Sequence, residues 1–262
     1  MSGEAAPPVL LEMLSANIAL VTLNRPEKRN AINVEAADAM ERIVRAIEAD
    51  RDVRAVILTS CDERMFCAGA DLAATASGTG KGIETPSGGF AGLVYAARTK
   101  PWIAAVEGKA LGGGFELCLA CDLIVASSAA LFGLPEVKQG LIAAGGGLQR
   151  IAGMIPRNVA NELVVTGAPV DAGFLERFGL VNRLVAPGET LATARGLAET
   201  IAANGPLAVQ FSLGVMRSLQ AANDGAGRVL VAERMSALRN SEDFREGPRA
   251  FVEKRAPVWT GR

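Results

Sequence analysis

The 262-residue chain contains no histidine. Within one chain, this absence excludes the Ser-His-Asp and Cys-His nucleophile systems and any zinc or iron site that needs an imidazole ligand. General acid-base chemistry is left to carboxylates, lysines, cysteines and the single tyrosine, Tyr95. The chain also lacks a run of about 18 uncharged apolar residues and a basic, then apolar, leader segment. We therefore expect no membrane segment and a reducing, cytoplasmic setting.

Cysteine is scarce, with four residues at positions 61, 67, 118 and 121. The last two form a Cys-x-x-Cys inside an apolar stretch, and no second such pair is present to complete a zinc site. Buried free thiols are the better interpretation. We expect neither a metal ion nor a separate cofactor.

Neither sign of charge is in excess, because 27 basic and 28 acidic residues give a net charge of -1. Such a chain has no general attraction to nucleic acid or to an anionic membrane. Half of the residues are hydrophobic and 21% are charged, which is typical of a globular protein. The chain has no repeats or long linkers, so we expect one core over residues 1–204 and a helical region over residues 205–262.

Short apolar runs bounded by turn residues precede a series of helical patterns, which predicts an α/β fold. The expected strands are Val9–Leu14, Asn17–Leu23, Val53–Thr59, Pro101–Val106, Leu123–Ala126, Ala130–Leu134 and Val181–Val185. The expected helices include Val34–Ala49, Asn158–Val165, Asp171–Phe178, Thr190–Ala203, Pro206–Ala221, Gly227–Leu238 and Ser241–Lys254.

The stretch Lys100–Ser128 carries the strongest indication of chemistry. An apolar strand leads into three glycines, at positions 112 to 114, and then into an apolar helix that is interrupted by Glu116. Glycines at such a turn permit a close approach of a ligand, and the first N–H groups of a helix have no partner within the helix. They suit an oxygen that gains negative charge. Glu116 follows Gly113 by about one turn, so one segment supplies an anion site and a possible general base.

A second turn of small residues follows the strand Val53–Thr59. It runs from Cys67 to Asp71 and exposes backbone N–H groups in the same way. We expect the two turns to converge. The segment between Ala73 and Phe90 is rich in Gly, Ser, Thr and Pro and reads as a loop beside the site. Its Gly78–Gly82 stretch resembles a phosphate loop but lacks the Ser or Thr that follows the lysine of a Walker motif, so that interpretation is rejected.

Glu136 is a further candidate because it stands in an apolar-flanked turn, twenty residues after Glu116. A second glycine run, at positions 145 to 147, follows it. No G-x-G-x-x-G follows a strand here, which argues against a dinucleotide site. Taken singly, each glycine run also fits a simpler role in tight helix packing, with Glu116 on the surface.

Together these segments resemble the enoyl-CoA hydratase/isomerase, or crotonase, superfamily over nearly the whole chain. The segments that carry the resemblance are NRPEK with NA (residues 24–31), CAGADL (67–72), KPWIAAVEGKALGGGFEL (100–117), FGLPEVKQGL (132–141) and REGPRAFVEKRAPVWTGR (245–262). The resemblance implies a spiral of ββα repeats followed by helices that build a homotrimer or a hexamer of two trimers. It implies an acyl-CoA thioester as substrate, with CoA as part of the substrate.

Residue roles follow from the resemblance, position by position. The N–H groups of Ala70 and Gly113 would form an oxyanion hole for the thioester carbonyl. Glu116 and Glu136 match both glutamates of the true hydratases. The CoA-binding residues would be Lys28, Ala68, Gly69, Ala70, Asp71, Leu72, Gly113, Phe251 and Lys254. One departure is Ala143-Ala144, where the family usually has Pro-Gly or Pro-Asp before the second glycine run.

The pair of glutamates favours hydration of an enoyl-CoA. Other crotonase reactions stay open, namely double-bond isomerisation, which needs one glutamate, and dehydration, which is the reverse chemistry. The segment Gly88–Leu93, with the GGGFEL and LPE turns, also resembles the carnitinyl-CoA dehydratase subgroup. A CoA-binding or RNA-associated homologue without turnover is the alternative from another class, and the presence of both carboxylates argues against it.

Overall fold

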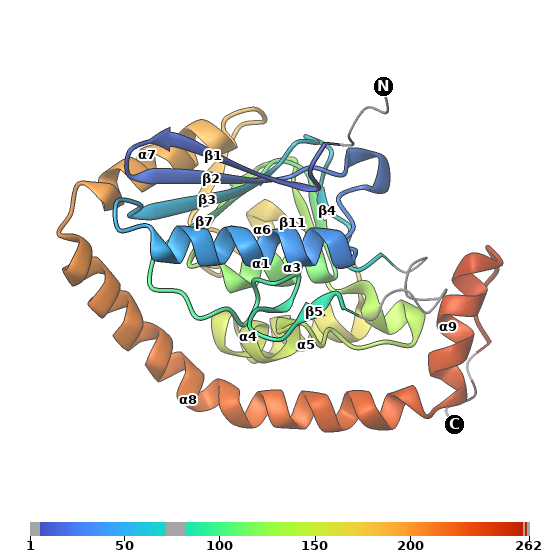
Figure 1. Ribbon diagram of the computed structural model, residues 1–262. Helices are drawn as coiled ribbons and strands as arrows, with labels where there is room; N and C mark the ends of the chain where they lie inside the picture. Colours follow the sequence, from blue (N-terminus) through green and yellow to red (C-terminus); the bar gives the residue numbers. More distant parts are fainter. Residues whose placement is uncertain (1–5, 72–81, 259, 261–262) are drawn as a thin grey trace.

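The chain alternates between two sheets, and each turn of this path contributes one strand to each sheet. The computed structural model describes residues 6–71, 82–258 and 260, without the side chains of residues 221–227. The larger sheet has the strand order β1 (Val9–Ser15), β2 (Ile18–Leu23), β3 (Ala55–Ser60), β7 (Trp102–Val106), β9 (Leu123–Ser127), β12 (Arg183–Val185). The smaller sheet has the order β11 (Val170–Asp171), β10 (Leu131–Gly133), β8 (Lys109–Leu111), β4 (Met65–Cys67). Figure 1 shows both sheets above α3 and α4.

Three successive pairs of strands build this spiral. In each pair, β3 and β4, β7 and β8, and β9 and β10, the first strand lies in the larger sheet and the second in the smaller one. Neighbours within these series are parallel, whereas β1 pairs with β2, and β10 with β11, in antiparallel fashion. A small antiparallel pair, β5 (Glu84–Thr85) and β6 (Gly89–Phe90), lies outside both sheets. The expected spiral α/β fold is confirmed.

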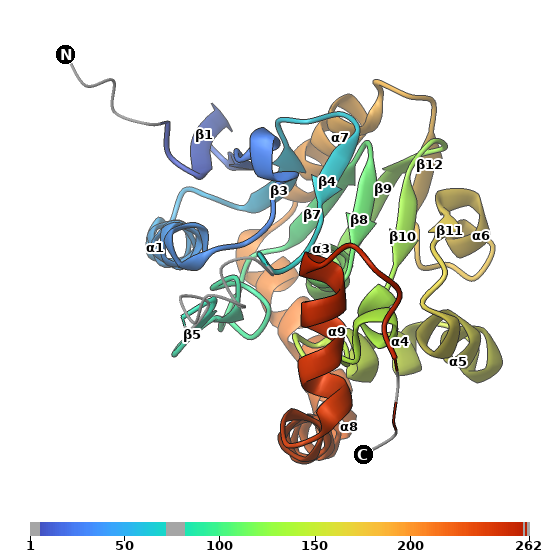
Figure 2. The same ribbon diagram turned by 90° about the vertical axis from the view of Figure 1, so that its right-hand side faces the viewer.

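The helices cover the sheets and then extend beyond them. They are α1 (Val34–Ala49), α3 (Gly113–Ala120), α4 (Gly147–Met154), α5 (Arg157–Thr166), α6 (Ala172–Glu176), α7 (Thr190–Ala202), α8 (Pro206–Arg239) and α9 (Glu242–Val252). Two 3-10 helices, η1 (Pro26–Lys28) and η2 (Pro135–Gln139), complete the described elements. In Figure 2, α9 stands in front of the body of the molecule, at the end of α8, and it packs against η2. None of the described helices is long and apolar enough to cross a membrane.

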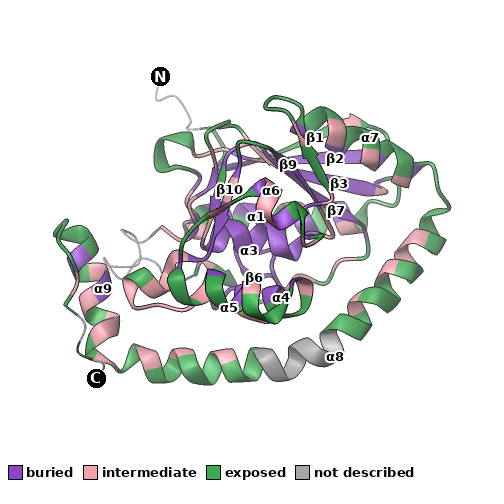
Figure 3. Ribbon diagram, turned by 180° about the vertical axis from the view of Figure 1, so that it is seen from behind, coloured by how far each residue is buried: buried purple, intermediate pink, exposed green. Residues whose placement is uncertain are grey.

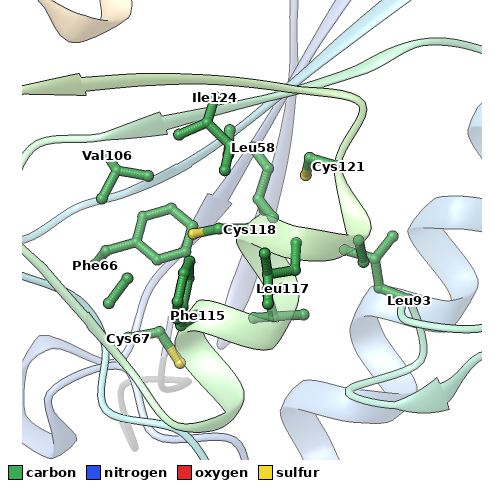
Figure 4. Packing of buried hydrophobic residues seen from close by; sticks show 14 of the residues in the cluster. Leu58, Phe66, Cys67, Leu93, Val106, Phe115, Leu117, Cys118, Cys121 and Ile124 are labelled. Carbon is green, nitrogen blue, oxygen red and sulfur yellow. The ribbon is translucent and has the colours of Figure 1, made fainter. Parts of the chain in front are cut away.

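The central strands of the larger sheet are buried on both faces, which explains why they are continuous apolar runs, whereas the edge strand β1 is mostly exposed. On one face, the alanines of α7, including Ala198, pack against Ile57 and Ile103. On the other, α1 and α3 join the main core. Figure 4 shows the part of this core around Phe115 and Cys118. The rings of Phe115 and Phe132 lie 5.2 Å apart, so α3 is packed tightly against the smaller sheet.

Local sequence accounts for several helix boundaries. Asn33 caps α1, because its side chain accepts a 3.0 Å hydrogen bond from the Ala36 N–H. Asp171 caps α6 in the same way through the Phe174 N–H. All four cysteines are free thiols, and Cys67, Cys118 and Cys121 are buried, which confirms the prediction for these three; Cys61 is exposed.

The prediction of two helices over Pro206–Ala221 and Gly227–Leu238 was wrong. They form one 34-residue helix, α8, that passes through the Asn-Asp-Gly stretch at 223–225 without a break. The local cost of such residues in a helix is about 1 kcal/mol for glycine and less for the others, and the helix-forming residues on both sides outweigh it. Figure 3 shows that α8 is mostly exposed over its described side chains. The last helix, α9, ends at Val252, two residues earlier than predicted, and Lys254 has a left-handed φ of 53°.

Candidate active site

Glu116 is ionisable, yet it lies in the interior of the molecule. It projects from α3, all eight residues of which are buried, and it is 4% exposed. Its Oε1 accepts a 2.8 Å hydrogen bond from the Gly147 N–H. Burial, and secondly the nearby Glu136 carboxyl group, raise the pKa of Glu116 to about 8. The simpler interpretation of Glu116 as a surface residue is therefore excluded.

Glu136 approaches the same glycine turn from η2. A Cβ built on Gly112, the N-cap of α3, would stand 3.1 Å from Glu136 Oε1. The other oxygen, Oε2, is buried and has no hydrogen-bond partner among the described residues. Burial raises the pKa of Glu136 to about 7. The sequence placed these two glutamates twenty residues apart, and the fold brings them together at the start of α3.

Two carboxyl groups with raised pKa values titrate as a pair. Repulsion between the charges of Glu116 and Glu136 opposes the loss of the second proton. With pKa values of about 8 and about 7, the pair holds on average one proton midway between these two pH values. One carboxylate can then accept a proton while the other carboxyl group can donate one, which is the requirement for acid-base chemistry at a single water molecule.

The two glycine-containing turns converge, as the sequence predicted. A Cβ built on Gly69 would stand 2.9 Å from the backbone nitrogen of Gly113 and 3.1 Å from the carbonyl oxygen of Leu111. Gly69 also has a φ of +93°, which an L-residue with a side chain rarely adopts. Glycine at position 69 therefore permits both the shape of the first turn and its contact with the second.

The backbone hydrogen bonds of these turns leave N–H groups of the described residues without an acceptor. The hydrogen bonds around the first turn run from the Ile32 N–H to Gly69 O at 2.8 Å and from the Asp71 N–H to Ile32 O at 2.9 Å. They bracket Ala70 and fix its orientation. Within the described part of the chain, neither the Ala70 N–H nor the Gly113 N–H donates a hydrogen bond. Two backbone donors on touching turns form an arrangement that can bind an oxygen carrying negative charge.

Phe90 provides an apolar wall that the sequence reading did not identify. Its ring lies against Gly113, where an added Cβ would overlap it, and a Cβ built on Gly145 would stand 3.1 Å from the Phe90 Cβ. Phe90 is 6% exposed. Its place within the loop between positions 73 and 90 gave no pattern that could distinguish it. Phe90 thus places an apolar surface beside Gly113 and Gly145.

The turn from Cys67 to Asp71 is tied to the segment that holds Lys28. The Ala68 N–H donates a 3.0 Å hydrogen bond to Arg29 O, next to Lys28, which is exposed in η1. Asp71 forms an ion pair of 3.5 Å with Arg25, a residue that the sequence reading did not select. Leu72, predicted to line this turn, lies outside the described residues.

Phe251 and Lys254 lie at the end of α9, apart from η1. Phe251 is 57% exposed, and Lys254 is also exposed. Helix α9 packs on η2, because Gly247 lies so close to the Gln139 carbonyl group that an added Cβ would overlap it. The structure thus places α9 beside the element that carries Glu136.

Comparisons with known proteins fit this fold and this geometry. The family model for enoyl-CoA hydratase/isomerase matches residues 13–262. The chain belongs to the enoyl-CoA hydratase/isomerase family, as its motifs indicated.

Individual relatives match almost from end to end. The mevalonyl-coenzyme A hydratase of Aspergillus fumigatus is 41% identical over 99% of this chain and 98% of its own length. The carnitinyl-CoA dehydratase of Salmonella typhi is 40% identical over 92% of this chain and 94% of its own length. A carnitinyl-CoA dehydratase structure from Mycobacterium avium is 45% identical and superimposes with a TM-score of 0.92, covering 98% of this chain and all of that one.

Proposed function

We propose that this chain is an enoyl-CoA hydratase, a hydro-lyase that adds water across the 2,3 double bond of an α,β-unsaturated acyl-CoA. The observation that carries the proposal is the carboxyl pair of Glu116 and Glu136 beside the Ala70 and Gly113 N–H groups. Membership of the family supports the reaction class. The relatives named above are hydratases and dehydratases of acyl-CoA compounds.

In the proposed reaction, the thioester oxygen accepts hydrogen bonds from the Ala70 and Gly113 N–H groups. Addition of water at C3 gives an enolate whose negative charge develops on that oxygen, and these donors stabilise it. Loss of one donor of this kind typically costs about 100- to 1,000-fold in rate. The reaction uses the protein's own donors and carboxyl groups, with CoA carried as part of the substrate.

Glu116 and Glu136 bind one water molecule between them. The ionised carboxylate takes a proton from the water as its oxygen attacks C3, and the protonated carboxyl group delivers a proton to C2. The proton count balances, because the pair is returned to its one-proton state after each turnover. Since this state exists between two pKa values, hydration activity is expected to be bell-shaped in pH.

CoA binding is assigned to the turn of Ala68, Gly69, Ala70, Asp71 and Leu72, together with Gly113. Lys28 would contact CoA phosphates from η1, which the Ala68 hydrogen bond to Arg29 ties to the turn. Phe251 and Lys254 would close the site from the end of α9. We also propose a cytoplasmic setting, which is supported by the four free thiols.

We propose further that the protein is a homotrimer or a pair of trimers. Helix α8 exposes Leu207, Phe211, Val215 and Leu219, which recur every four residues and are each at least 60% exposed. A stripe of this kind on a long helix is typical of a surface that another chain covers. Light scattering would measure the assembled mass against a chain mass of 27.2 kDa.

A panel of enoyl-CoA thioesters tests the proposal. The panel varies in acyl length, branching and polarity, and hydration is followed as the loss of conjugated-thioester absorbance. Turnover of at least one member is expected, with that turnover abolished in the double variant Glu116→Gln/Glu136→Gln. Binding of CoA esters without turnover of any member would contradict an enzymatic role.

Dehydration of a 3-hydroxyacyl-CoA is a second candidate, favoured by the similarity to carnitinyl-CoA dehydratases at 40% and 45% identity. It uses the same groups in reverse order. Assays started from the hydroxyacyl-CoA and from the enoyl-CoA would give the two rates. A 3-enoyl-CoA substrate would detect isomerisation, for which one glutamate is sufficient.

A further inference from the structure

The turn of Gly145, Gly146 and Gly147 is shaped around the Glu116 carboxyl group. A Cβ on Gly145 would overlap Glu116 Oε2, and one on Gly147 would stand 2.9 Å from Oε1. The Gly147 N–H donates the 2.8 Å hydrogen bond to Oε1. Any shift of this turn would therefore move a donor away from the buried carboxyl group or force a contact with it.

Arg150 binds this turn from the next turn of α4. Its Nη1 donates to the Gly146 carbonyl oxygen at 3.3 Å, and its own backbone N–H donates to the same oxygen at 3.3 Å. Gly146 has a φ of +102°, and a Cβ on it would overlap the Arg150 guanidinium group. The guanidinium group thus lies directly against the middle residue of the turn.

The same guanidinium group reaches a second segment. Its Nη2 donates a 2.6 Å hydrogen bond to Val94 O, and its Cζ lies 5.2 Å from the centre of the Tyr95 ring. On that ring, Arg228 of α8 places its Cζ 3.9 Å from the centre, and Gln149 donates a hydrogen bond to the Tyr95 hydroxyl group. Arg150 therefore connects the glycine turn to the segment of Val94 and Tyr95, which lies outside α4.

Arg150 also contributes a positive charge near Glu116. The groups that face Glu116 are the Glu136 carboxyl of η2, the Arg150 guanidinium of α4 and the N–H groups of Gly145 and Gly147. The phenol of Tyr95 is close enough to interact with Glu116 and is neutral, since burial raises its pKa. Among these groups, Arg150 is the one cation that favours the ionised form of Glu116.

We propose that Arg150 is a positioning residue for Glu116, which holds the turn 145–147 in register and places a positive charge near the carboxyl group. This inference rests on the proposed hydratase function for its kinetic consequences. It assigns Arg150 no contact with the substrate. A long side chain with a planar fork is required, because two carbonyl oxygens from different segments are bound at once.

The test compares Arg150→Met, Arg150→Lys and the control Arg157→Met, an exposed arginine at the start of α5. For Arg150→Met we expect kcat to fall by up to about 100-fold with KM changed by less than about 2-fold, because a misplaced group costs rate rather than binding. The limb of the pH profile that is governed by Glu116 should move to higher pH by about one unit, since a nearby cation is lost. Arg150→Lys should keep the limb in place yet lose much of kcat.

Hydrogen exchange supplies a readout that does not depend on turnover. Peptides covering residues 142–149 should exchange faster in both Arg150 variants than in the wild type and in Arg157→Met. If Arg150→Met folds poorly, Arg150→Lys carries the test through its unchanged pH limb, lower kcat and faster exchange. An Arg150→Lys variant with wild-type kcat and exchange, or an Arg150→Met variant with an unmoved limb, overturns the proposal. Absence of hydration by the wild-type chain contradicts the proposed function alone, and the exchange result then decides the role of Arg150.

Discussion

Gly114 of α3 lies so close to the carbonyl group of Cys67 that a Cβ on residue 114 would overlap the Cys67 oxygen. This contact joins the buried helix to β4, the strand that leads into the turn carrying Ala70. The distance between the two turns of the site is thus set by direct backbone packing rather than by a flexible side chain. Interiors packed to this density respond to a single added methyl group.

The substitution Gly114→Ala should therefore separate α3 from β4. We expect the free energy of unfolding to fall by about 1–3 kcal/mol, as for other overpacked positions. Hydration activity should fall as well, because Gly113 and Ala70 move apart. The matched control is Gly153→Ala in α4, where an added Cβ meets no atom within 4 Å. It should raise stability by about 0.4–1 kcal/mol through the unfolded state. Urea unfolding measures both, and equal stability of the two variants would contradict the packing argument.

The substitution Glu116→Gln should stabilise the protein, and more so as the pH rises. The pKa of Glu116 is about 8 in the folded chain, against an ordinary value of 4.5. Below that ordinary value both states are protonated, so Glu116 adds no pH dependence. Between pH 4.5 and about 8 the unfolded chain releases a proton that the folded chain retains, so the free energy of unfolding falls with rising pH.

The gain of Glu116→Gln over wild type should thus grow through this window and level off above it. Each pH unit contributes up to about 1.4 kcal/mol, and the total is on the order of a few kcal/mol. Urea unfolding at pH 5, 6.5 and 8, at one protein concentration, measures the difference. A gain that stays constant across these pH values would show that the carboxyl group keeps an ordinary pKa in the folded state.

Glu116→Gln and Glu136→Gln should each reduce hydration by orders of magnitude while CoA-ester binding stays near the wild-type value. Glutamine retains the shape and the hydrogen bonding but cannot exchange the proton. Because the two groups act as a unit, the double variant should be little worse than the worse single variant. Steady-state kinetics with isothermal binding measurements tests this. Full activity of either single variant would leave only the backbone donors of Ala70 and Gly113 as the active groups.

Gly247→Ala should weaken the support of Glu136 from α9. The added Cβ would overlap the Gln139 carbonyl oxygen, so α9 or η2 must move. We expect lower kcat and a loss of about 1–3 kcal/mol in stability. Gly196→Ala in α7, where an added Cβ meets no atom within 4 Å, is the control and should leave kcat unchanged.

Truncation of the chain before Gly247 should weaken CoA binding and the association between chains. A truncated chain that binds CoA with unchanged affinity and keeps the same oligomeric state would contradict this role of α9.

Much of the fold and of the site could be predicted from the sequence. Strands such as Trp102–Val106 are recognisable because burial on both faces produces continuous apolar runs. Glu116 is conspicuous because it interrupts an apolar helix, and the turns at Gly69 and Gly113 are marked by small residues. These features are local, so they can be detected within a few residues of chain.

What could not be predicted depends on contacts between distant segments. Arg150 looks like an ordinary helix arginine until the fold brings Val94 to it across 56 positions. Phe90 gains its meaning from Gly113 and Gly145, which the sequence separates widely from it. The continuity of α8 was missed because the turn-forming residues at 223–225 suggested a break. A single sequence does not reveal whether the helical residues on both sides keep the helix continuous.

Helix α8 joins the body of the molecule to α9 through one continuous, curved helix. An uninterrupted helix of 34 residues is about 51 Å long, measured along its axis at 1.5 Å per residue. In its first half, Arg217 forms a 2.7 Å ion pair with Asp122, and in its second half Arg228 lies against the Tyr95 ring; after its end comes α9, which rests on η2. A second chain that covers the exposed stripe of α8 would restrain this helix and, through α9, the backbone of η2 that carries Glu136. Association between chains would then be coupled to the position of a carboxyl group at the site.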